Sequence, residues 1–197
     1  MKTALLIIDM QNDFLPGGSL AVAGGDQIIP IMNELQNDYD LVVATQDWHP
    51  ADHGSFASQH PSRKAFEMAE LSGLPQMLWP DHCVQNSWGA ELSADLEQKR
   101  IAAIFRKGMD AQFDSYSAFF DNGHQKATGL EGYLKGLGTE EVHLCGLAAD
   151  YCVFYSAMDA LNLGFKVAIL NKATKAISPE GYLKSLQELM NSGGQII

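Results

Sequence analysis

The chain has 197 residues, 46% of them hydrophobic, and a formal net charge of -11. This length suits a single compact domain, and no apolar run approaches the roughly 18 residues that a membrane-spanning helix needs. Acidity without any basic run excludes nucleic acid and anionic membranes as partners. The N-terminal apolar run is too short for a signal peptide, so we expect a cytoplasmic protein.

Strand-like and helical patterns alternate along the chain. Short apolar runs predict strands at Ala4–Asp9, Leu41–Thr45, Ile101–Phe105, Val142–Cys145 and Lys166–Leu170, with a weaker sixth near Gln195–Ile197. Helical periodicity between them predicts helices at Asp26–Gln36, Ala90–Lys99, Leu130–Leu137, Tyr151–Leu163 and Pro179–Asn191. This order predicts a three-layer α/β/α fold of the Rossmann-like kind, with a central, mainly parallel sheet of about six strands.

Residues 46–88 interrupt this alternation. The segment has little periodicity but contains tryptophans, four histidines and most of the prolines. A long irregular segment in a small domain is usually functional or disordered, and its aromatic content argues against disorder. We therefore expect one domain over residues 1–197, with a functional insert at about 46–88.

Several reactive side chains follow the predicted strands at their carboxyl ends, where parallel α/β sheets bind ligands. Asp9 ends the first strand, Asp47 and His49 follow the second, Lys107 follows the third, and Cys152 lies shortly after the fourth. We expect these groups to meet at one edge of the sheet.

Cys152 is the candidate nucleophile. Small residues precede it and a helix is predicted to begin near Tyr151, so the helix dipole would favour the thiolate. The alternative is a buried, inert cysteine. The other two cysteines, Cys83 and Cys145, lie far apart in sequence and form no Cys-x-x-Cys spacing, which argues against a disulfide framework.

Two charged residues would assist such a thiol. Asp9 closes an apolar strand, so burial would raise its pKa and suit it to general acid–base work. Lys107 would keep a thiolate and the Asp9 carboxylate charged within one cluster. The alternative role for Asp9 is to cap the following turn. The alternative for Lys107 is a solvated lysine at the end of a strand.

The insert contains a candidate metal site. Asp47 and His49 are two residues apart, so in an extended segment they project to the same face. His82 would complete a two-histidine, one-carboxylate set that leaves coordination positions open. His53 would serve as a fourth ligand or would orient a ligand. The three remaining histidines, which show no partner pattern and are expected on the surface or in packing, are His60, His124 and His143.

Taken together, these motifs resemble the nicotinamidases of the isochorismatase-like cysteine hydrolase family. The matching segments are Ile8–Phe14 (IDMQNDF), Gln46–Pro50 (QDWHP), Trp79–Val84 (WPDHCV), Lys107–Gly108 (KG) and Gly146–Val153 (GLAADYCV). They occur in the family's order over nearly the whole chain. The metal motifs distinguish nicotinamidases from isochorismatases, which share the fold.

The resemblance implies a catalytic triad of Asp9, Lys107 and Cys152, and a metal bound by Asp47, His49 and His82 with His53 nearby. It also implies an oxyanion hole from the backbone N–H groups of Ala148 and Cys152, and a cis peptide bond between Ala148 and Ala149. The implied substrate-binding positions are Phe14, Trp79, Tyr116 and Ala149. At position 149 many relatives have threonine, and alanine removes only that hydroxyl. The chain also ends at Ile197, earlier than the family pattern suggests.

The function implied is hydrolysis of nicotinamide to nicotinate and ammonia through a cysteine thioester, in NAD salvage, with pyrazinamide as a further substrate. One divalent metal ion is expected as cofactor, zinc ahead of iron or manganese. Two alternatives remain at this stage: an amidase for another small amide, and a metal-binding or redox-sensing protein that exposes a low-pKa Cys152. The metal's identity and the formation of a homo-oligomer are left open by the sequence.

Overall fold

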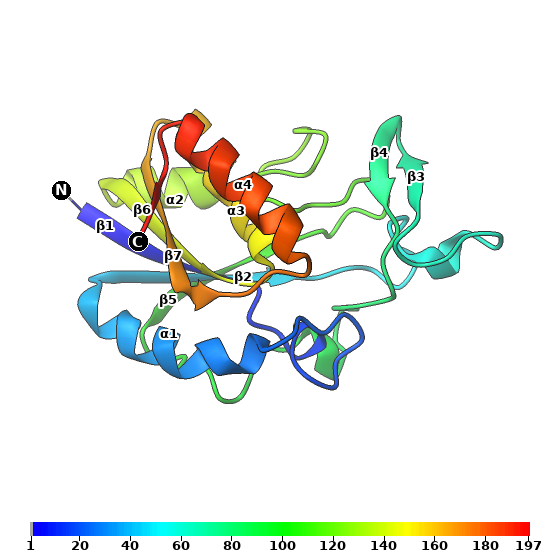
Figure 1. Cartoon of the computed structure of the whole chain (residues 1–197), viewed down its shortest axis with the longest axis horizontal. Coiled ribbons are helices and arrows are strands. Elements are labelled where there is room, and N and C mark those ends of the chain that lie inside the picture. The colour runs from blue at the N-terminus through cyan, green and yellow to red at the C-terminus, as the bar shows by residue number, and fades with distance from the viewer. Residues whose placement is uncertain (1) are drawn as a thin grey trace.

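The structure, a computed structural model, describes residues 2–197. Its central sheet has six strands in the order β5-β2-β1-β6-β7-β8, and every pairing is parallel (Figure 1). The α/β fold with a six-stranded, mainly parallel sheet is therefore confirmed. The strands are β1 (Lys2–Ile8), β2 (Leu41–Asp47), β5 (Ile101–Lys107), β6 (Thr139–Gly146), β7 (Lys166–Thr174) and β8 (Gln195–Ile196).

Both faces of the sheet are covered, which explains the continuous apolar runs of β1 and β2. Alternate β1 side chains enter two separate cores: Leu5 and Ile7 pack in one, and Leu6 and Ile8 pack in the other. The first core is covered by α1 (Ile29–Leu35). The second is covered by α2 (Leu130–Gly136), α3 (Phe154–Asn162) and α4 (Pro179–Asn191), as the two sides of the sheet in Figure 1 show. Within residues 2–197, no helix is both long and apolar enough to cross a membrane.

The irregular segment after β2 contains a short antiparallel hairpin, β3 (Met68–Leu71) and β4 (Leu74–Met77). This hairpin lies apart from the main sheet, beyond the carboxyl end of β2 (Figure 1). The sequence did not predict it, because its strands are short and only partly buried.

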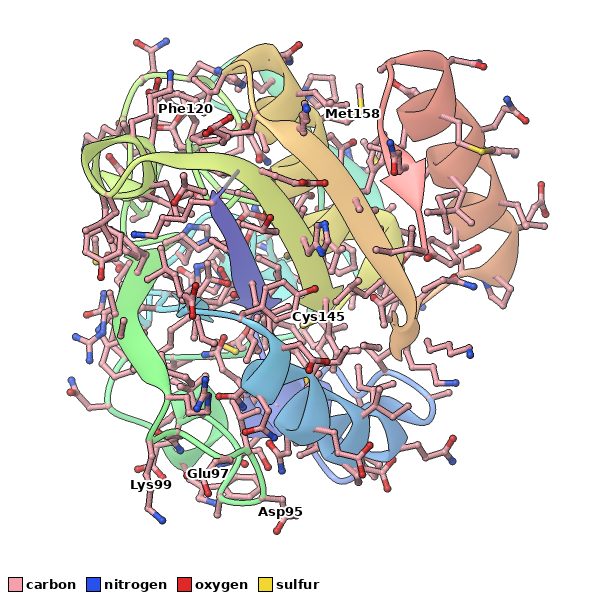
Figure 2. All side chains as sticks on the ribbon, turned by 90° about the vertical axis from the view of Figure 1, so that its left-hand side faces the viewer. Asp95, Glu97, Lys99, Phe120, Cys145 and Met158 are labelled. Atoms are coloured by element: carbon pink, nitrogen blue, oxygen red, sulfur yellow. The ribbon has the colours of Figure 1, made fainter. Side chains whose placement is uncertain are left out.

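The helix predicted at Ala90–Lys99 does not form. This segment is a loop after a single 3-10 turn at Trp88–Ala90, and Figure 2 shows Asp95, Glu97 and Lys99 along it. Side chains before β2 satisfy its backbone instead of helical hydrogen bonds: the Asn33 amide bonds the Asp95 carbonyl, and the Gln36 amide bonds the Glu97 carbonyl, each at 2.9 Å. Tertiary contacts override the helical periodicity here.

The last residue of β6, Gly146, allows a close approach to β1. Its φ is +111°, and a Cβ there would lie 2.1 Å from the Ile8 carbonyl oxygen. We expect Gly146→Ala to lower the free energy of unfolding by about 3 kcal/mol or more, because the strained φ adds to a backbone clash.

The matched control is Gly164→Ala, where φ is +88° but nothing lies within 4 Å of the new Cβ. That variant should lose only about 1 kcal/mol. Urea unfolding of both variants measures the difference, and equal losses would contradict a steric role for Gly146.

Candidate active site and metal centre

The carboxyl ends of three adjacent strands and the turn after a fourth meet at one edge of the sheet. Asp9 directly follows β1, Asp47 ends β2, and Lys107 ends β5 in register with Asp47. Cys152 lies in a π-helical turn, Ala149–Val153, that follows β6 and continues into α3. From β1 the chain adds β2 and β5 on one side of the sheet and β6, β7 and β8 on the other, and the point where the strand order reverses is where such sheets bind ligands. The structure thus brings all four side chains together.

Lys107 is the centre of this group. Its Nζ atom lies 2.7 Å from Asp47 Oδ1, 2.9 Å from Asp9 Oδ2 and 3.5 Å from Cys152 Sγ. It also donates to the Ser115 carbonyl at 2.9 Å. The side chains of Lys107 and Asp9 are fully buried. One ammonium therefore neutralises two buried carboxylates beside the thiol.

Two supporting contacts at this cluster were not predicted from the sequence. The Thr45 hydroxyl donates to Asp9 Oδ1 at 2.7 Å and accepts the Asp9 backbone N–H at 3.1 Å. The Gln11 side chain pairs with the backbone of Asp47 through two hydrogen bonds of 2.8 Å. Both polar residues are buried, and a polar residue at the end of an apolar strand is the signal that could have revealed Thr45.

Burial and charge shift the pKa of each member of the cluster. Burial raises the pKa of Asp9, and the nearby Lys107 only partly offsets this. Burial would lower the pKa of Lys107, but Asp47 and Asp9 outweigh it and raise that pKa well above its usual value. For Asp47, burial is outweighed by Lys107 and His49, which lower its pKa.

Burial opposes the effect that the helix dipole was expected to have on the Cys152 thiol. Burial raises the pKa of Cys152 well above its ordinary value; Lys107 opposes this shift, while Asp9 and Asp47 add to it. The resting group is a thiol whose neighbour Asp9 also has a raised pKa. Oxygen atoms of Asp9 and Asp47 lie within 4.8 Å of the sulfur, so both carboxylates are neighbours of the thiol.

The metal-ligand candidates Asp47, His49 and His82 are brought together. The Nε2 atoms of His49 and His82 lie 3.6 and 3.9 Å from the same atom, Asp47 Oδ2. Their Nδ1 atoms are held by the carbonyls of Gly108 and Pro80, both at 2.8 Å. Because these bonds orient both rings and leave each Nε2 free to coordinate, the donor set fits a divalent metal ion.

His53 lies beside this trio, with its ring centroid 4.2 Å from that of His49. Its Nδ1 atom hydrogen-bonds with the Ser55 hydroxyl at 2.8 Å, and its buried Nε2 atom has no hydrogen-bond partner among the described residues. Its metal-binding atoms group with those of His49 and of Asp114, which the sequence analysis did not single out. His60, His124 and His143 belong to no such group within residues 2–197.

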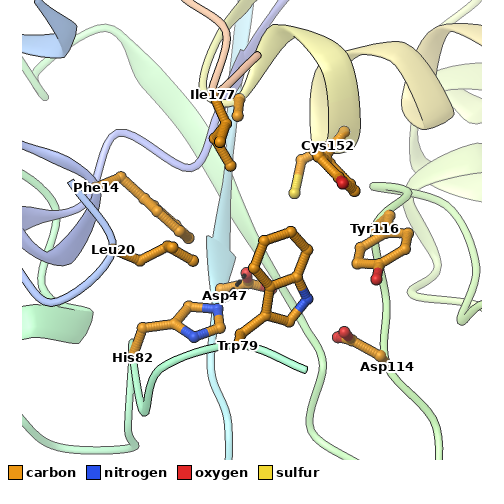
Figure 3. Close-up of a pocket in the computed structure, with 11 residues that line it drawn as sticks. Phe14, Leu20, Asp47, Trp79, His82, Asp114, Tyr116, Cys152 and Ile177 are labelled. Carbon is orange, nitrogen blue, oxygen red and sulfur yellow. Dashed lines mark ion pairs between the residues drawn. The ribbon is translucent and has the colours of Figure 1, made fainter. Parts of the chain in front are cut away.

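A narrow cavity adjoins the thiol. Figure 3 shows Phe14 and Leu20 on the left of this cavity, Tyr116 on the right, Trp79 in the centre and Ile177 at the top, with Asp47 and His82 among the lining residues. Of the four substrate-binding positions that the family resemblance implies, Phe14, Trp79 and Tyr116 line the cavity and Ala149 does not. Sequence reasoning missed four further lining residues, because loop positions follow no period: Leu20, Asp114, Tyr151 and Ile177.

The turn before Cys152 differs from expectation in two ways. The cis peptide bond joins Leu147 to Ala148, one bond earlier than predicted. Small residues at 148 and 149 permit either position, and two backbone hydrogen bonds set the turn: Leu147 N–H to the Ile8 carbonyl at 2.9 Å, and Ala149 N–H to the Lys175 carbonyl at 2.8 Å. The Ala149 donor is thus committed within the protein, and Ala148, not Ala149, lines the cavity.

Known proteins share this architecture. The isochorismatase domain family matches residues 3–197. The nicotinamidase of Escherichia coli strain K12 is 46% identical over 199 residues, covering 98% of this chain and 93% of that protein. The solved nicotinamidase/pyrazinamidase of Acinetobacter baumanii has a TM-score of 0.97 at 45% identity, covering 100% of this chain and 95% of that one. The Pyrococcus horikoshii pyrazinamidase, solved in complex with zinc, has a TM-score of 0.82 at 37% identity, covering 100% and 99% of the two chains.

Proposed function

The chain belongs to the isochorismatase family, and from this membership we propose that it is a nicotinamidase, which hydrolyses nicotinamide to nicotinate and ammonia through a thioester on Cys152. One observation carries the proposal: the Cys152 thiol, with Lys107 Nζ 3.5 Å from its sulfur, opens into an aromatic cavity that Asp47 and His82 also line. A candidate nucleophile, an aromatic cavity and a candidate metal site are thereby combined. The reaction belongs to NAD salvage.

The first step is activation of the thiol. Asp9 takes the proton from Cys152, and the sulfur attacks the amide carbon, so that a C–S bond forms. Lys107 stabilises the negative charge that moves between the sulfur and Asp9, because its ammonium contacts both. The raised pKa of Asp9 matches its role as a base that later returns the proton.

The oxyanion that forms on the substrate oxygen would be held by the backbone N–H groups of Ala148 and Cys152. Both residues line the cavity, and backbone donors fixed before reaction are effective stabilisers of such charge. The C–N bond then breaks, and Asp9 gives its proton to the departing ammonia. Water attacks the thioester with Asp9 again as base, which releases nicotinate and restores the thiol.

Asp47, His49 and His82 would hold one divalent metal ion, which we expect to be zinc as in the Pyrococcus horikoshii relative. Bound there, the ion would supply a Lewis-acidic position for the ring nitrogen of the substrate and for water. Asp47, His49 and His82 would place this coordination position beside the thiol, so that the ring and the scissile amide are held together in one orientation. Pyrazinamide carries a ring nitrogen at the equivalent place, so we propose it as a second substrate.

A redox-sensing role for Cys152 fits the site less well. Sensor cysteines are accessible and have a low pKa, whereas Cys152 is 8% exposed and its pKa is raised by burial. An amidase for some other small amide uses the same residues, and substrate comparison distinguishes it.

Benzamide tests the assignment of the ring nitrogen. It has the shape and scissile amide of nicotinamide but a C–H in place of the ring nitrogen. The polar group of the protein that recognises this nitrogen would therefore have no partner on benzamide. We expect its kcat/KM to be roughly 100-fold or more below that of nicotinamide, measured by ammonia release from the zinc-loaded protein.

His49→Ala should shrink this gap by impairing nicotinamide turnover preferentially. The matched control is His60→Ala, in the same insert but outside the ligand group, where the ring bonds the Gly54 carbonyl and the gap should persist. If the wild-type protein hydrolyses the two amides equally well, ring-nitrogen recognition is refuted.

A further inference from the structure

Asp150, two residues before the nucleophile, joins the turn that carries Cys152 to the loop between β7 and α4. Its Oδ1 atom accepts the backbone N–H of Ile177 at 2.9 Å, and its Oδ2 atom accepts that of Ser178 at 2.8 Å. The side chain is 7% exposed. Both carboxylate oxygens are therefore used to hold one short stretch of the loop.

Two more hydrogen bonds fix the same loop. The Ala149 N–H donates to the Lys175 carbonyl at 2.8 Å, next to Asp150 in the chain. The Ser178 hydroxyl accepts the Gly181 N–H at 3.1 Å and so caps α4. Ile177 is thus placed relative to the nucleophile turn, and Asp150 provides the direct connection.

The side chain of Ile177 reaches the substrate cavity. Figure 3 shows it at the top of the view, above Trp79, with Phe14 to its left and Cys152 to its right; all four residues line the cavity. A β-branched side chain has few rotamers, so the position of its backbone determines the position of its methyl groups. Ile177 therefore sets how much space a flat ring has on this side.

We propose that Ile177 is a specificity-determining residue that excludes ring-substituted amides, and that Asp150 is the positioning residue that holds it there. This inference rests on the proposed nicotinamidase function. One methyl group in a fitted apolar site changes discrimination by about 10- to 200-fold, so displacement of Ile177 should be measurable as a change in substrate preference.

The first test replaces Ile177 itself. Ile177→Ala and the milder Ile177→Val are compared with the wild type on nicotinamide and on nicotinamides methylated at each free ring carbon. We expect Ile177→Ala to raise kcat/KM for at least one methylated substrate by about 10-fold or more relative to nicotinamide, with a smaller rise in Ile177→Val. Leu183→Ala, an exposed position on α4, is the control and should leave the ratios unchanged.

The second test removes the positioning carboxylate. Asp150→Asn keeps the shape but has one acceptor oxygen, so one of the two N–H groups of Ile177 and Ser178 loses its partner. We expect KM for nicotinamide to rise about 10-fold with kcat changed by less than about threefold, and the substrate ratios to shift as in Ile177→Ala. In the Ile177→Ala background the same change should add little.

Asp159→Asn is the matched control, since Asp159 is also buried and lies on α3 but pairs with His124. It should alter neither KM nor the ratios. Unchanged ratios in a folded, active Ile177→Ala protein would overturn the assignment of Ile177. A fall in kcat alone for Asp150→Asn would overturn that of Asp150. Failure of the wild type to release ammonia from nicotinamide would instead refute the proposed function.

Discussion

Replacement of Cys152 by alanine is expected to abolish ammonia release from nicotinamide, with a fall in kcat of roughly 10,000-fold or more. The reason is that no thioester can form, while the remaining groups only bind and polarise the substrate. The fold should persist, because the change removes a single sulfur atom and leaves the backbone of the turn unaltered. Steady-state kinetics and the zinc content of the purified variant measure both expectations.

Cys145→Ala provides the matched control. Cys145 is also a buried thiol with a pKa raised by burial, but it lies within β6, where its sulfur contacts the Leu6 carbonyl at 3.7 Å. This variant should keep its activity and lose about 1 kcal/mol of stability. Activity of Cys152→Ala close to that of the wild type would remove Cys152 from the role of nucleophile.

The second large effect is expected at Asp9 and Lys107. Asp9→Asn cannot take the thiol proton, and Lys107→Ala leaves the charge on sulfur and carboxylate uncompensated. Each variant should lose about 1,000-fold in kcat, equivalent to about 4 kcal/mol of transition-state stabilisation. Because both residues act on the same proton transfer, the double variant should lose far less than the roughly 8 kcal/mol of an additive pair.

Folding must be measured alongside these rates. Lys107→Ala leaves the buried carboxylates of Asp9 and Asp47 without their shared ammonium, which should cost about 3–5 kcal/mol of stability. Asp9→Asn removes a charge instead and should cost less. Chemical denaturation of each variant separates lost stability from lost catalysis. Fully additive losses in folded proteins would count against a shared catalytic unit.

The sequence by itself determined the architecture and the edge of the sheet where chemistry takes place. Strands covered on both faces are continuously apolar, so the apolar runs in the sequence predicted β1 and β2. Parallel strands share the direction of their carboxyl ends, so Asp9, Asp47 and Lys107 could be assigned to one edge without any coordinates. These inferences need only the local pattern of apolar residues and a rule that holds for all parallel sheets, so the sequence is sufficient for them.

Tertiary structure decided what depends on contacts between distant segments. The 90–99 segment forms no helix because Asn33 and Gln36 bond its backbone carbonyls from 62 and 61 positions earlier in the chain. The raised pKa of Cys152 reflects burial, which only packing creates. Ile177 lines the substrate cavity because Asp150 holds its loop, and no period along the chain encodes a contact between residues so far apart.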